Sequence, residues 1–435
     1  EVAPVLYRSL ASGGRRDFAI EFRERADLSG ADAMSWQARG REVYARLRDT
    51  AEHSQASVRR VLDAQGISYE AHWIKNTILV RGGDLLALQA VASHPEVLRV
   101  RDLPRTKLIR PDHPPQRGPG AVAGVGDNIH WIGADTVWSE GTNGDGVTIG
   151  VIDTGVLATH SAIRQQYRGW QNGAYSHDYN WFDPTAHSPE PISADPHGTH
   201  VIGTVVGDDR NPDESLRNRI GVAPGADWIA CLGLPLDGDS NFSLLACGEF
   251  MLAPTKTDGS AADPDKRPQV VNNSWSEGNC NGEATSFYAD MVEAWVAAGI
   301  FPVFAEGNAP NCGLPEPPGL STVSSPASLG TAFAVGSTGN HDGAYAEHSN
   351  WGPTSDTAPG LPSYPDPRGY PNLKPQVVAP GVDIRSAVDF GDAEYATMTG
   401  TSMSSPHITG LVALMLEAGE CLAGEILSAG RECLL

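Results

Sequence analysis

The pattern of apolar and polar positions over residues 17–103 predicts a small α+β unit. Apolar and polar side chains alternate over 18–23, which is the period of a half-buried strand. Over 33–64 the apolar residues fall on one helical stripe, and many charged residues lie on the opposite face. Asp84 is placed to cap a second, shorter helix, and the further expected strands are 67–73, 77–81 and 97–101. The order strand, helix, strand, strand, helix, strand is that of a ferredoxin-like fold.

Two other segments lack such a pattern. Residues 1–16 are expected to form a loose leader. Residues 104–126 contain five prolines and four glycines. Such stretches are exposed and mobile and are preferred sites of proteolytic cleavage, so this segment is predicted to be a linker where processing takes place.

From Ile132 onward the pattern is that of an α/β protein. The apolar run 147–152 reads as a strand buried on both faces of a parallel sheet. It ends at Asp153, and open α/β sheets place their chemistry at the carboxyl ends of their strands. Strand and helix patterns then alternate, which predicts a parallel sheet with right-handed crossovers. The expected strands are 228–232, 269–272 and 301–305, and the expected helices are 242–252, 284–298 and one after Asp195, whereas 309–376 should be mostly loop and short strands.

Charge divides the chain into two parts. Residues 1–112 contain 18 Lys and Arg against 15 Asp and Glu, a charge of +3, and the remainder contains 13 against 38, a charge of −25. The two parts should attract each other at long range. The net charge of −22 argues against a nucleic-acid partner, and the apolar runs are too short to span a membrane.

All six cysteines lie in the acidic part, and none has the CxxC spacing of a zinc site. An even number without metal spacing favours disulfides and an oxidising compartment. Six buried free thiols in a cytosolic protein are the alternative. Proximity in sequence suggests the pairs Cys231–Cys247, Cys280–Cys312 and Cys421–Cys433.

A serine motif stands before the last helical pattern of the chain, Gly400-Thr401-Ser402-Met403-Ser404-Ser405-Pro406-His407. Proline is tolerated in the first turn of a helix, so Ser402 is expected at a helix N-terminus. Unpaired N–H groups and the helix dipole favour developing negative charge there, which suits a nucleophilic serine. Taken alone, the motif could also be an ordinary helix cap.

Four separated motifs together resemble the subtilisin-like serine proteases (subtilases). They are Asp153-Thr154-Gly155, His197-Gly198-Thr199-His200, Gly307-Asn308 and Gly400-Thr401-Ser402-Met403, in the order Asp, His, Ser. The stretches 226–231, 250–258 and 271–276 resemble the bacillopeptidase F-like branch in particular. The resemblance covers about residues 127–416. It implies a parallel-sheet α/β catalytic domain over 127–435, preceded by an inhibitor-type prodomain over 17–103.

The resemblance implies a role for each matched residue. Ser402 would attack the scissile carbonyl to give an acyl-enzyme, and His197 would take up and return the proton. Asp153 would fix the imidazole tautomer. Asn308 would donate its side-chain amide to the oxyanion, together with the backbone N–H of Ser402. Catalysis of this kind requires no cofactor.

Substrates of this family pair with backbone strands that border the cleft. The resemblance implies that one edge is formed by Ser274, Trp275 and Ser276, and that the primary specificity pocket is lined by Ala305, Glu306 and Gly307 with the region near Ser324. Glu306 stands where many relatives carry a small apolar residue. We expect that it either biases the pocket toward Arg and Lys or points away into solvent.

Three neighbouring residues are expected to have other roles. His200 is the second histidine of its motif and is interpreted as structural, His407 as a packing residue, and Asp195 as a loop or turn acid. Subtilases often bind structural calcium, and the acidic pairs Asp208–Asp209 and Asp237/Asp239 are candidate ligands or simply solvated acids.

The expected function is that of a secreted, monomeric serine endopeptidase precursor that acts on proteins and peptides. It would cut itself within 104–126, and its prodomain would act as an intramolecular inhibitor. An esterase would instead need a G-x-S-x-G motif and the order Ser, Asp, His. A catalytically silent binding module with the subtilase fold is the second alternative. The chain opens at Glu1 and ends 33 residues after Ser402, so we expect a processed start and a truncated or unusual C-terminus.

Overall fold

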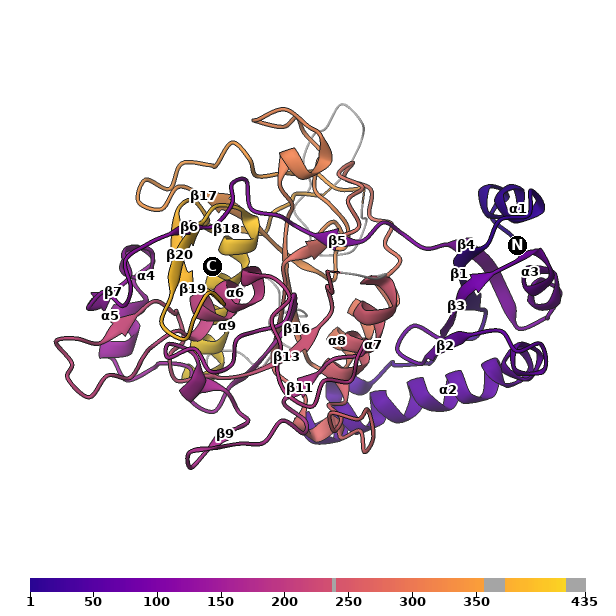
Figure 1. Cartoon of the computed structure of the whole chain (residues 1–435), viewed down its shortest axis with the longest axis horizontal. Coiled ribbons are helices and arrows are strands. Elements are labelled where there is room, and N and C mark those ends of the chain that lie inside the picture. The colour runs from indigo at the N-terminus through magenta and orange to yellow at the C-terminus, as the bar shows by residue number, and fades with distance from the viewer. Residues whose placement is uncertain (237–239, 356–371, 420–435) are drawn as a thin grey trace.

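The structure is a computed structural model that describes residues 1–236, 240–355 and 372–419. Figure 1 shows two units side by side, connected by an extended segment that crosses the larger unit. We refer to three parts: the N-terminal unit (1–103), the linker (104–126) and the C-terminal unit (127–419).

The N-terminal unit is a four-stranded antiparallel sheet covered on one face by helices. The strand order β2-β3-β1-β4 is the predicted ferredoxin-like topology, which is therefore confirmed. Asp84 caps α3 as expected, since its side chain accepts a hydrogen bond from the Ala87 N–H at 3.0 Å. The elements are α1 (Pro4–Ala11), β1 (Arg16–Phe22), η1 (Ala31–Ala33), α2 (Trp36–Ala64), β2 (Tyr69–His72), β3 (Thr77–Gly83), α3 (Leu85–Ala92) and β4 (Val97–Asp102).

Two predictions for this unit are wrong. Residues 1–16 are not loose, because Leu6 and Leu10 of α1 are buried in the core of the unit. Strand β1 is buried on both faces rather than on one. Phe18, Ile20 and Phe22 face the core of the N-terminal unit. Ala19 points to the other face and belongs to an apolar cluster formed by residues of both units. A face that docks on another unit is as buried as a face in a core.

The C-terminal unit is built on a parallel seven-stranded sheet in the order β11-β13-β8-β14-β16-β17-β18. Helices cover both faces. Val151 packs in the cluster that contains α6 and α9, whereas the next residue, Ile152, packs in the cluster that contains α7 and α8. The predicted parallel α/β fold is confirmed. Strands of the sheet are β8 (Thr148–Asp153), β11 (Trp181–Phe182), β13 (Asp227–Leu232), β14 (Val270–Asn273), β16 (Phe301–Ala305), β17 (Phe333–Thr338) and β18 (Val377–Pro380).

Six helices and several short elements complete the described part of this unit. Helix α8 starts at Ala289 rather than 284, because Glu277 accepts hydrogen bonds from the Ser286 hydroxyl and the Phe287 N–H and so holds the preceding segment. The helices are α4 (Asp127–Trp131), α5 (Ala134–Ser139), α6 (Pro196–Val206), α7 (Ser240–Leu252), α8 (Ala289–Ala297) and α9 (Thr401–Ala418). The short elements are β9 (Trp170–Gln171), β10 (Ala174–Tyr175), β12 (Asn218–Arg219), β15 (Trp275–Ser276), β19 (Ile384–Ala387), β20 (Tyr395–Met398), η2 (Arg164–Gln166), η3 (Pro264–Lys266) and η4 (Ala309–Cys312).

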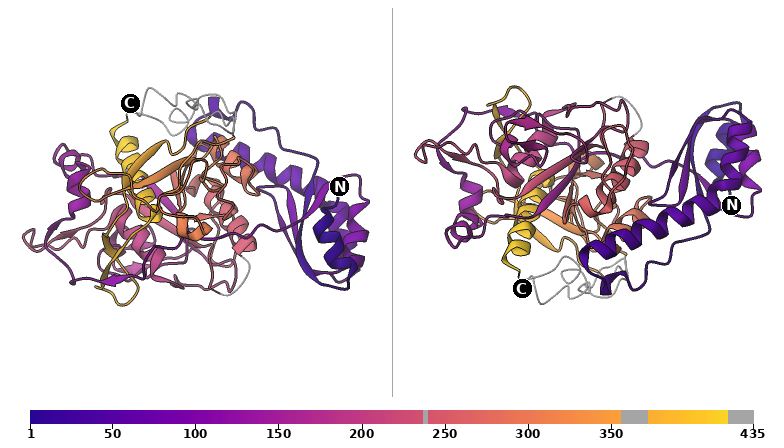
Figure 2. Two further views of the ribbon diagram at one scale, coloured as in Figure 1. Left: turned by 90° about the horizontal axis from the view of Figure 1, so that it is seen from above. Right: turned by 90° about the horizontal axis from the view of Figure 1, so that it is seen from below.

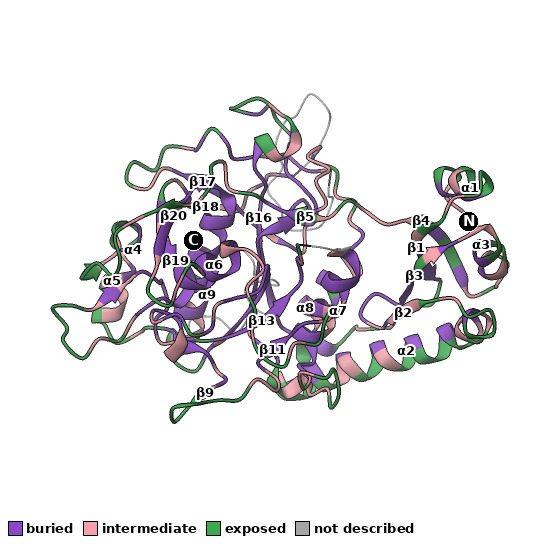
Figure 3. Ribbon diagram, in the orientation of Figure 1, coloured by how far each residue is buried: buried purple, intermediate pink, exposed green. Residues whose placement is uncertain are grey.

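The N-terminal unit docks on α7 and α8. Both views in Figure 2 show α2 reaching from the N-terminal unit along the larger unit, and Figure 3 shows buried residues on one side of this helix. Arg39 of α2 donates to the carbonyl oxygens of Ala297 and Val296 at the end of α8, at 2.6 and 2.8 Å. Arg25 forms an ion pair with Asp290 at 2.9 Å. The contacts join basic groups of the first unit to acidic or carbonyl groups of the second.

Two disulfides confirm the first two suggested pairings. Cys231–Cys247 joins β13 to α7 in the buried core, and Cys280–Cys312 joins two loops near the end of β16. Cys421 and Cys433 lie outside the described residues.

Most of the linker is exposed, as its composition predicted, but one short stretch is buried against the C-terminal unit. Leu108 is 7% and Ile109 is 1% exposed. Its strands β5 (Lys107–Leu108), β6 (Gln116–Arg117) and β7 (Gly124–Val125) pair with β15, β20 and β12. In Figure 1 the linker leaves β4, crosses the C-terminal unit at β5 and continues to β6 and β7. Backbone pairing along this path holds a Pro- and Gly-rich segment in place.

Candidate active site

Asp153 and His197 form a buried pair. Asp153 ends β8, and His197 is the second residue of α6. The Nδ1–H of His197 donates to Oδ1 of Asp153 at 2.8 Å, so Nε2 is left as the unprotonated nitrogen. Gly198 permits this approach, because a Cβ there would lie 2.1 Å from the carbonyl oxygen of Gly155.

The start of α6 is fixed by side chains that cap it. Asp195 accepts from the His197 N–H at 3.0 Å and is the N-cap of the helix, as expected for a turn acid. The Thr154 hydroxyl accepts from the Gly198 N–H at 3.0 Å and donates to the Asp195 carbonyl at 2.9 Å. These bonds tie the histidine to the end of the strand that carries Asp153.

Ser402 is the second residue of α9, at a helix N-terminus as predicted. The prediction for the proline was wrong: Pro406 lies inside the helix, past its first turn. Pro406 has no N–H to donate to the carbonyl four residues earlier, which is that of Ser402. The Ser274 hydroxyl donates to this carbonyl instead, at 3.3 Å.

Asn308 follows β16 and is held by the residue before the serine. Its Oδ1 accepts from the Thr401 N–H at 3.0 Å and from the Thr401 hydroxyl at 2.9 Å. The side-chain NH₂ is thereby aimed away from α9. It donates to the carbonyl oxygen of Arg110, in the linker, at 2.9 Å.

The linker lies across all of these groups. The Ser402 hydroxyl donates to the Ile109 carbonyl at 2.9 Å, and the Ile109 N–H donates to the Ser274 carbonyl at 3.3 Å. On the far side of Arg110, the Asp112 N–H donates to the Thr399 carbonyl at 3.0 Å. Ser402 and His197 are both 0% exposed. A peptide from the same chain thus covers Ser402 and Asn308.

The structure brings the expected edge residues to this peptide. Trp275 and Ser276 of β15 pair antiparallel with Leu108 and Lys107, and Ser274 takes the next hydrogen bond. Ala305 ends β16, fully buried. Gly307 has φ +113°, and a Cβ there would lie 2.7 Å from the hydroxyl of Ser324, so the two residues are neighbours.

Glu306 points neither to solvent nor to a basic substrate side chain. It is 0% exposed, and its carboxyl lies against Gly336 of β17. Burial raises the pKa of Glu306 well above its usual range, and the Lys374 ammonium and a hydrogen bond from Tyr345 only partly oppose this. The expectation of solvent exposure is wrong. A carboxyl whose ionised form is disfavoured by burial is a poor source of fixed negative charge for an Arg or Lys pocket.

His200 and His407 are both buried in the packing around α6 and α9. His200 Nε2 donates to the Ile384 carbonyl at 2.9 Å, and burial lowers its pKa to about 3. His407 Nδ1 donates to the Met403 carbonyl at 2.8 Å, and burial lowers its pKa to about 4. Both rings are neutral at ordinary pH, which fits the packing roles that the sequence predicted.

The acidic pair Asp208–Asp209 does not fit a calcium site. The Arg217 guanidinium donates two hydrogen bonds to the Asp208 carboxylate, and Asp209 accepts two N–H groups of its own loop. Asp237 and Asp239 lie outside the described residues. Within the described ranges, no group of three or more His, Cys, Asp or Glu is placed to hold a metal ion. In the same ranges, no helix is both long and apolar enough to cross a membrane.

Comparison with known proteins assigns the family. The model of the Subtilase family matches residues 144–427, which is more than half of the chain. The chain belongs to the subtilase family. This subtilase is 33% identical over 431 residues to bacillopeptidase F of Bacillus subtilis (strain 168), a match that covers 96% of the chain and 28% of that protein. It is 29% identical over 285 residues to the thermophilic serine proteinase of Bacillus sp. (strain AK1), covering 66% of the chain and 56% of that protein.

Solved structures agree on the fold of this subtilase. The crystal structure of fervidolysin from Fervidobacterium pennivorans, a keratinolytic enzyme related to subtilisin, matches with a TM-score of 0.56 at 16% identity. The match covers 95% of this chain and 56% of that one. The subtilase described here therefore spans only part of the length of each of these relatives.

Sequence patterns missed several residues of the site. Asn311 of η4 accepts from the Arg110 N–H at 2.7 Å and donates to its carbonyl at 3.0 Å, but it stands in a loop without any period. Thr401 belongs to a recognised motif, yet its hold on Asn308 is visible only in three dimensions. The apolar pair Leu108-Ile109, between the polar stretches 105–107 and 110–117, is a signal in the sequence that could have marked the buried part of the linker.

Proposed function

We propose that this subtilase is a serine endopeptidase precursor that cuts its own linker and then hydrolyses proteins and peptides. The observation that carries the proposal is the linker peptide, which meets Ser402, Asn308 and the edge strand β15 at once. The Ser402 hydroxyl and the Asn308 amide donate to two adjacent carbonyls of this peptide, an arrangement that a module with only a binding role would not require. Membership of the subtilase family supports the same reaction.

In the proposed mechanism Ser402 is the nucleophile. Its Oγ attacks the carbonyl carbon while the proton passes to Nε2 of His197. Asp153 holds the tautomer through Nδ1 and stabilises the imidazolium. The oxyanion would be bound by the Ser402 N–H at the start of α9 and by the Asn308 amide, which must move from the Arg110 carbonyl that it holds in this structure to the attacked carbonyl of Ile109. The imidazolium then protonates the leaving amine, and a water molecule hydrolyses the acyl-enzyme by the same steps in reverse order.

The first substrate is the peptide bond Ile109–Arg110. The register of β5 on β15 brings the Ile109 carbonyl next to the Ser402 hydroxyl, at 2.9 Å. The following bond, Arg110–Pro111, carries the tertiary amide of proline and lacks an N–H. After the cut the N-terminal unit remains docked on α7 and α8, where it acts as an inhibitor. Two disulfides and the family support a secreted enzyme.

The test uses the purified chain and its Ser402→Ala variant. We expect the unaltered chain to release a fragment that starts at Arg110, identified by N-terminal sequencing and intact mass, and to react with a fluorophosphonate probe. Ser402→Ala should remain uncut and unlabelled. Cleavage of Ser402→Ala at the same site and rate would refute self-processing, and an unlabelled parent would favour the silent binding module.

A further inference from the structure

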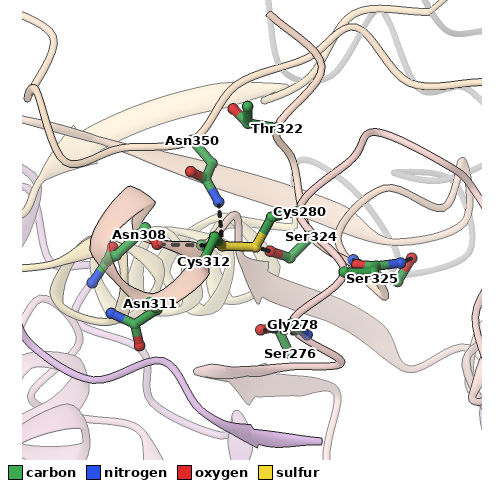
Figure 4. The surroundings of a disulfide bond; sticks show 12 residues. Ser276, Gly278, Cys280, Asn308, Asn311, Cys312, Thr322, Ser324, Ser325 and Asn350 are labelled. Carbon is green, nitrogen blue, oxygen red and sulfur yellow. Dashed lines mark hydrogen bonds between the residues drawn. A yellow bond between two sulfur atoms is a disulfide. The ribbon is translucent and has the colours of Figure 1, made fainter. Parts of the chain in front are cut away.

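The disulfide Cys280–Cys312 joins the two loops that border the peptide in the cleft. Cys280 follows β15, the strand that pairs with the peptide, and Cys312 ends η4, which begins directly after Asn308. Figure 4 shows the two sulfur atoms between these loops, with Asn311 and Gly278 on the side of the peptide. The link spans 32 residues of sequence and connects segments that follow two different strands of the sheet.

Both joined loops contact the same stretch of the peptide. Lys107 pairs through its backbone with Ser276 on one side of the disulfide, and its Nζ donates to the Asn311 carbonyl on the other side, at 3.1 Å. The Asn311 side chain holds both backbone groups of Arg110. Lys107 of the peptide therefore contacts both loops, and the disulfide joins these two loops to each other.

The sulfur atoms also contact the surroundings of the pocket. Cys280 Sγ lies 3.1 Å from the Ser324 hydroxyl, and the Asn350 side chain donates to Cys312 Sγ at 3.6 Å. Both cysteines are half-buried. The other disulfide, between Cys231 and Cys247, is 0% exposed and joins β13 to α7, so it serves as a matched control.

We propose that Cys280–Cys312 is a positioning element of the substrate cleft, which sets the spacing of β15 and η4 for a peptide with a basic side chain at the position of Lys107. The inference rests on the proposed peptidase function. The Asn308 side chain is held by Thr401, whereas Cys312 Sγ contacts only the backbone carbonyl of Asn308, at 3.6 Å. Loss of the disulfide should therefore weaken substrate binding while the oxyanion contact, and with it kcat, is kept.

The experiment compares two double variants of the self-processed enzyme, Cys280→Ser/Cys312→Ser and Cys231→Ser/Cys247→Ser. Active sites are counted with the fluorophosphonate probe. Hydrolysis of an internally quenched peptide is then measured, with inhibition by a synthetic peptide of residues 105–109, which ends before the bond Ile109–Arg110 and so is not cut there. For Cys280→Ser/Cys312→Ser we expect KM and Ki to rise about tenfold with kcat within about twofold, because the two loops must now be ordered by the substrate. The control should lower Tm and leave KM and Ki unchanged.

A second peptide carrying Lys107→Met completes a cycle. The parent enzyme should bind this second peptide several-fold more weakly than the first. The Cys280→Ser/Cys312→Ser variant should bind the two peptides with equal affinity. Unchanged KM and Ki in this variant, or equal rises in both double variants, would overturn the inference. An inactive parent enzyme would instead refute the proposed function, so the two failures are distinguishable.

Reduction of the parent enzyme keeps the test decisive if the variant does not fold. Dithiothreitol gives two electrons and two protons to the half-buried disulfide and closes to its own cyclic disulfide. Alkylation and mass spectrometry identify the cysteines that were reduced. A rise in KM that follows the reduction of Cys280–Cys312 and reverses on reoxidation supports the inference, and an unchanged KM at full reduction of this pair overturns it.

Discussion

Docking of the N-terminal unit depends on one arginine more than on its neighbours. Arg39 is 8% exposed and donates to two carbonyl oxygens at the C-terminal end of α8, where the helix dipole also favours a positive charge. Arg41, on the same helix, pairs with Asp265 on the surface. We predict that Arg39→Ala loosens docking strongly and that Arg41→Ala hardly changes it.

The loss of docking free energy in Arg39→Ala follows from the two hydrogen bonds that Arg39 donates. A hydrogen bond from a charged group contributes about 1.5–3 kcal/mol, and we take the lower end because burial of the guanidinium costs part of the gain. Burial indeed lowers the pKa of Arg39, which shows that cost. Two bonds then give about 3 kcal/mol, a factor of about 100 in the docking equilibrium. A surface ion pair such as that of Arg41 contributes little.

The assay uses the Ser402→Ala chain, which lacks the hydroxyl that the proposed self-cleavage requires. Added trypsin can cut after Lys107 only when the linker leaves the cleft, so the cutting rate follows the population of the undocked state. We expect Arg39→Ala to raise the rate of this one cut, followed by mass spectrometry, by about 100-fold. Equal rates for Arg39→Ala and Arg41→Ala would refute the reasoning.

Two further predictions concern stability. Arg217→Ala leaves the buried carboxylate of Asp208 without its guanidinium partner and should lower the free energy of unfolding, measured by urea titration, by about 3 kcal/mol. Arg219→Ala loses only a surface ion pair and should have a small effect. Equal effects of the two substitutions would contradict this reasoning. His200 and His407 have folded pKa values of about 3 and 4 against about 6.5 when unfolded, so the unfolded state binds more protons. The contribution of the two neutral rings to the free energy of unfolding is complete above pH 6.5, and each ring loses about 2 kcal/mol of it at pH 5. A Tm of the Ser402→Ala chain that stays constant from pH 7 to pH 5 would contradict this prediction.

Much of the fold could be predicted because local patterns and long-range packing agree. Helix α2 matches its apolar stripe, and β8 is buried on both faces as its apolar run implied. Asp153, His197, Asn308 and Ser402 were singled out by motif, and two disulfide pairs by proximity. Asp153 is paired with His197 as the motifs suggest, but the Ser402 hydroxyl donates to the linker, and among the described residues Nε2 of His197 has no hydrogen-bond partner.

The remaining features depend on contacts between distant segments. The linker looked mobile by composition, but backbone pairing does not depend on side-chain type, so Pro and Gly content gave no sign of it. The buried outer face of β1 has its partner in the other unit. Pro406 could not be placed within its helix, because the compensating donor, Ser274, is 132 positions earlier in the chain. The burial of Glu306, which raises the pKa of its carboxyl, comes from segments that are distant in the sequence.

Ser274 links two parts of the site. Its carbonyl accepts from the Ile109 N–H of the linker peptide, and its hydroxyl supports the carbonyl that Pro406 leaves without a helical donor. A redesign that shifts the start of β15 to accept other substrates would therefore also shift the nucleophile. Changes of specificity in this scaffold belong in the loop after Ser276, where the edge can be reshaped while Ser402 stays in place.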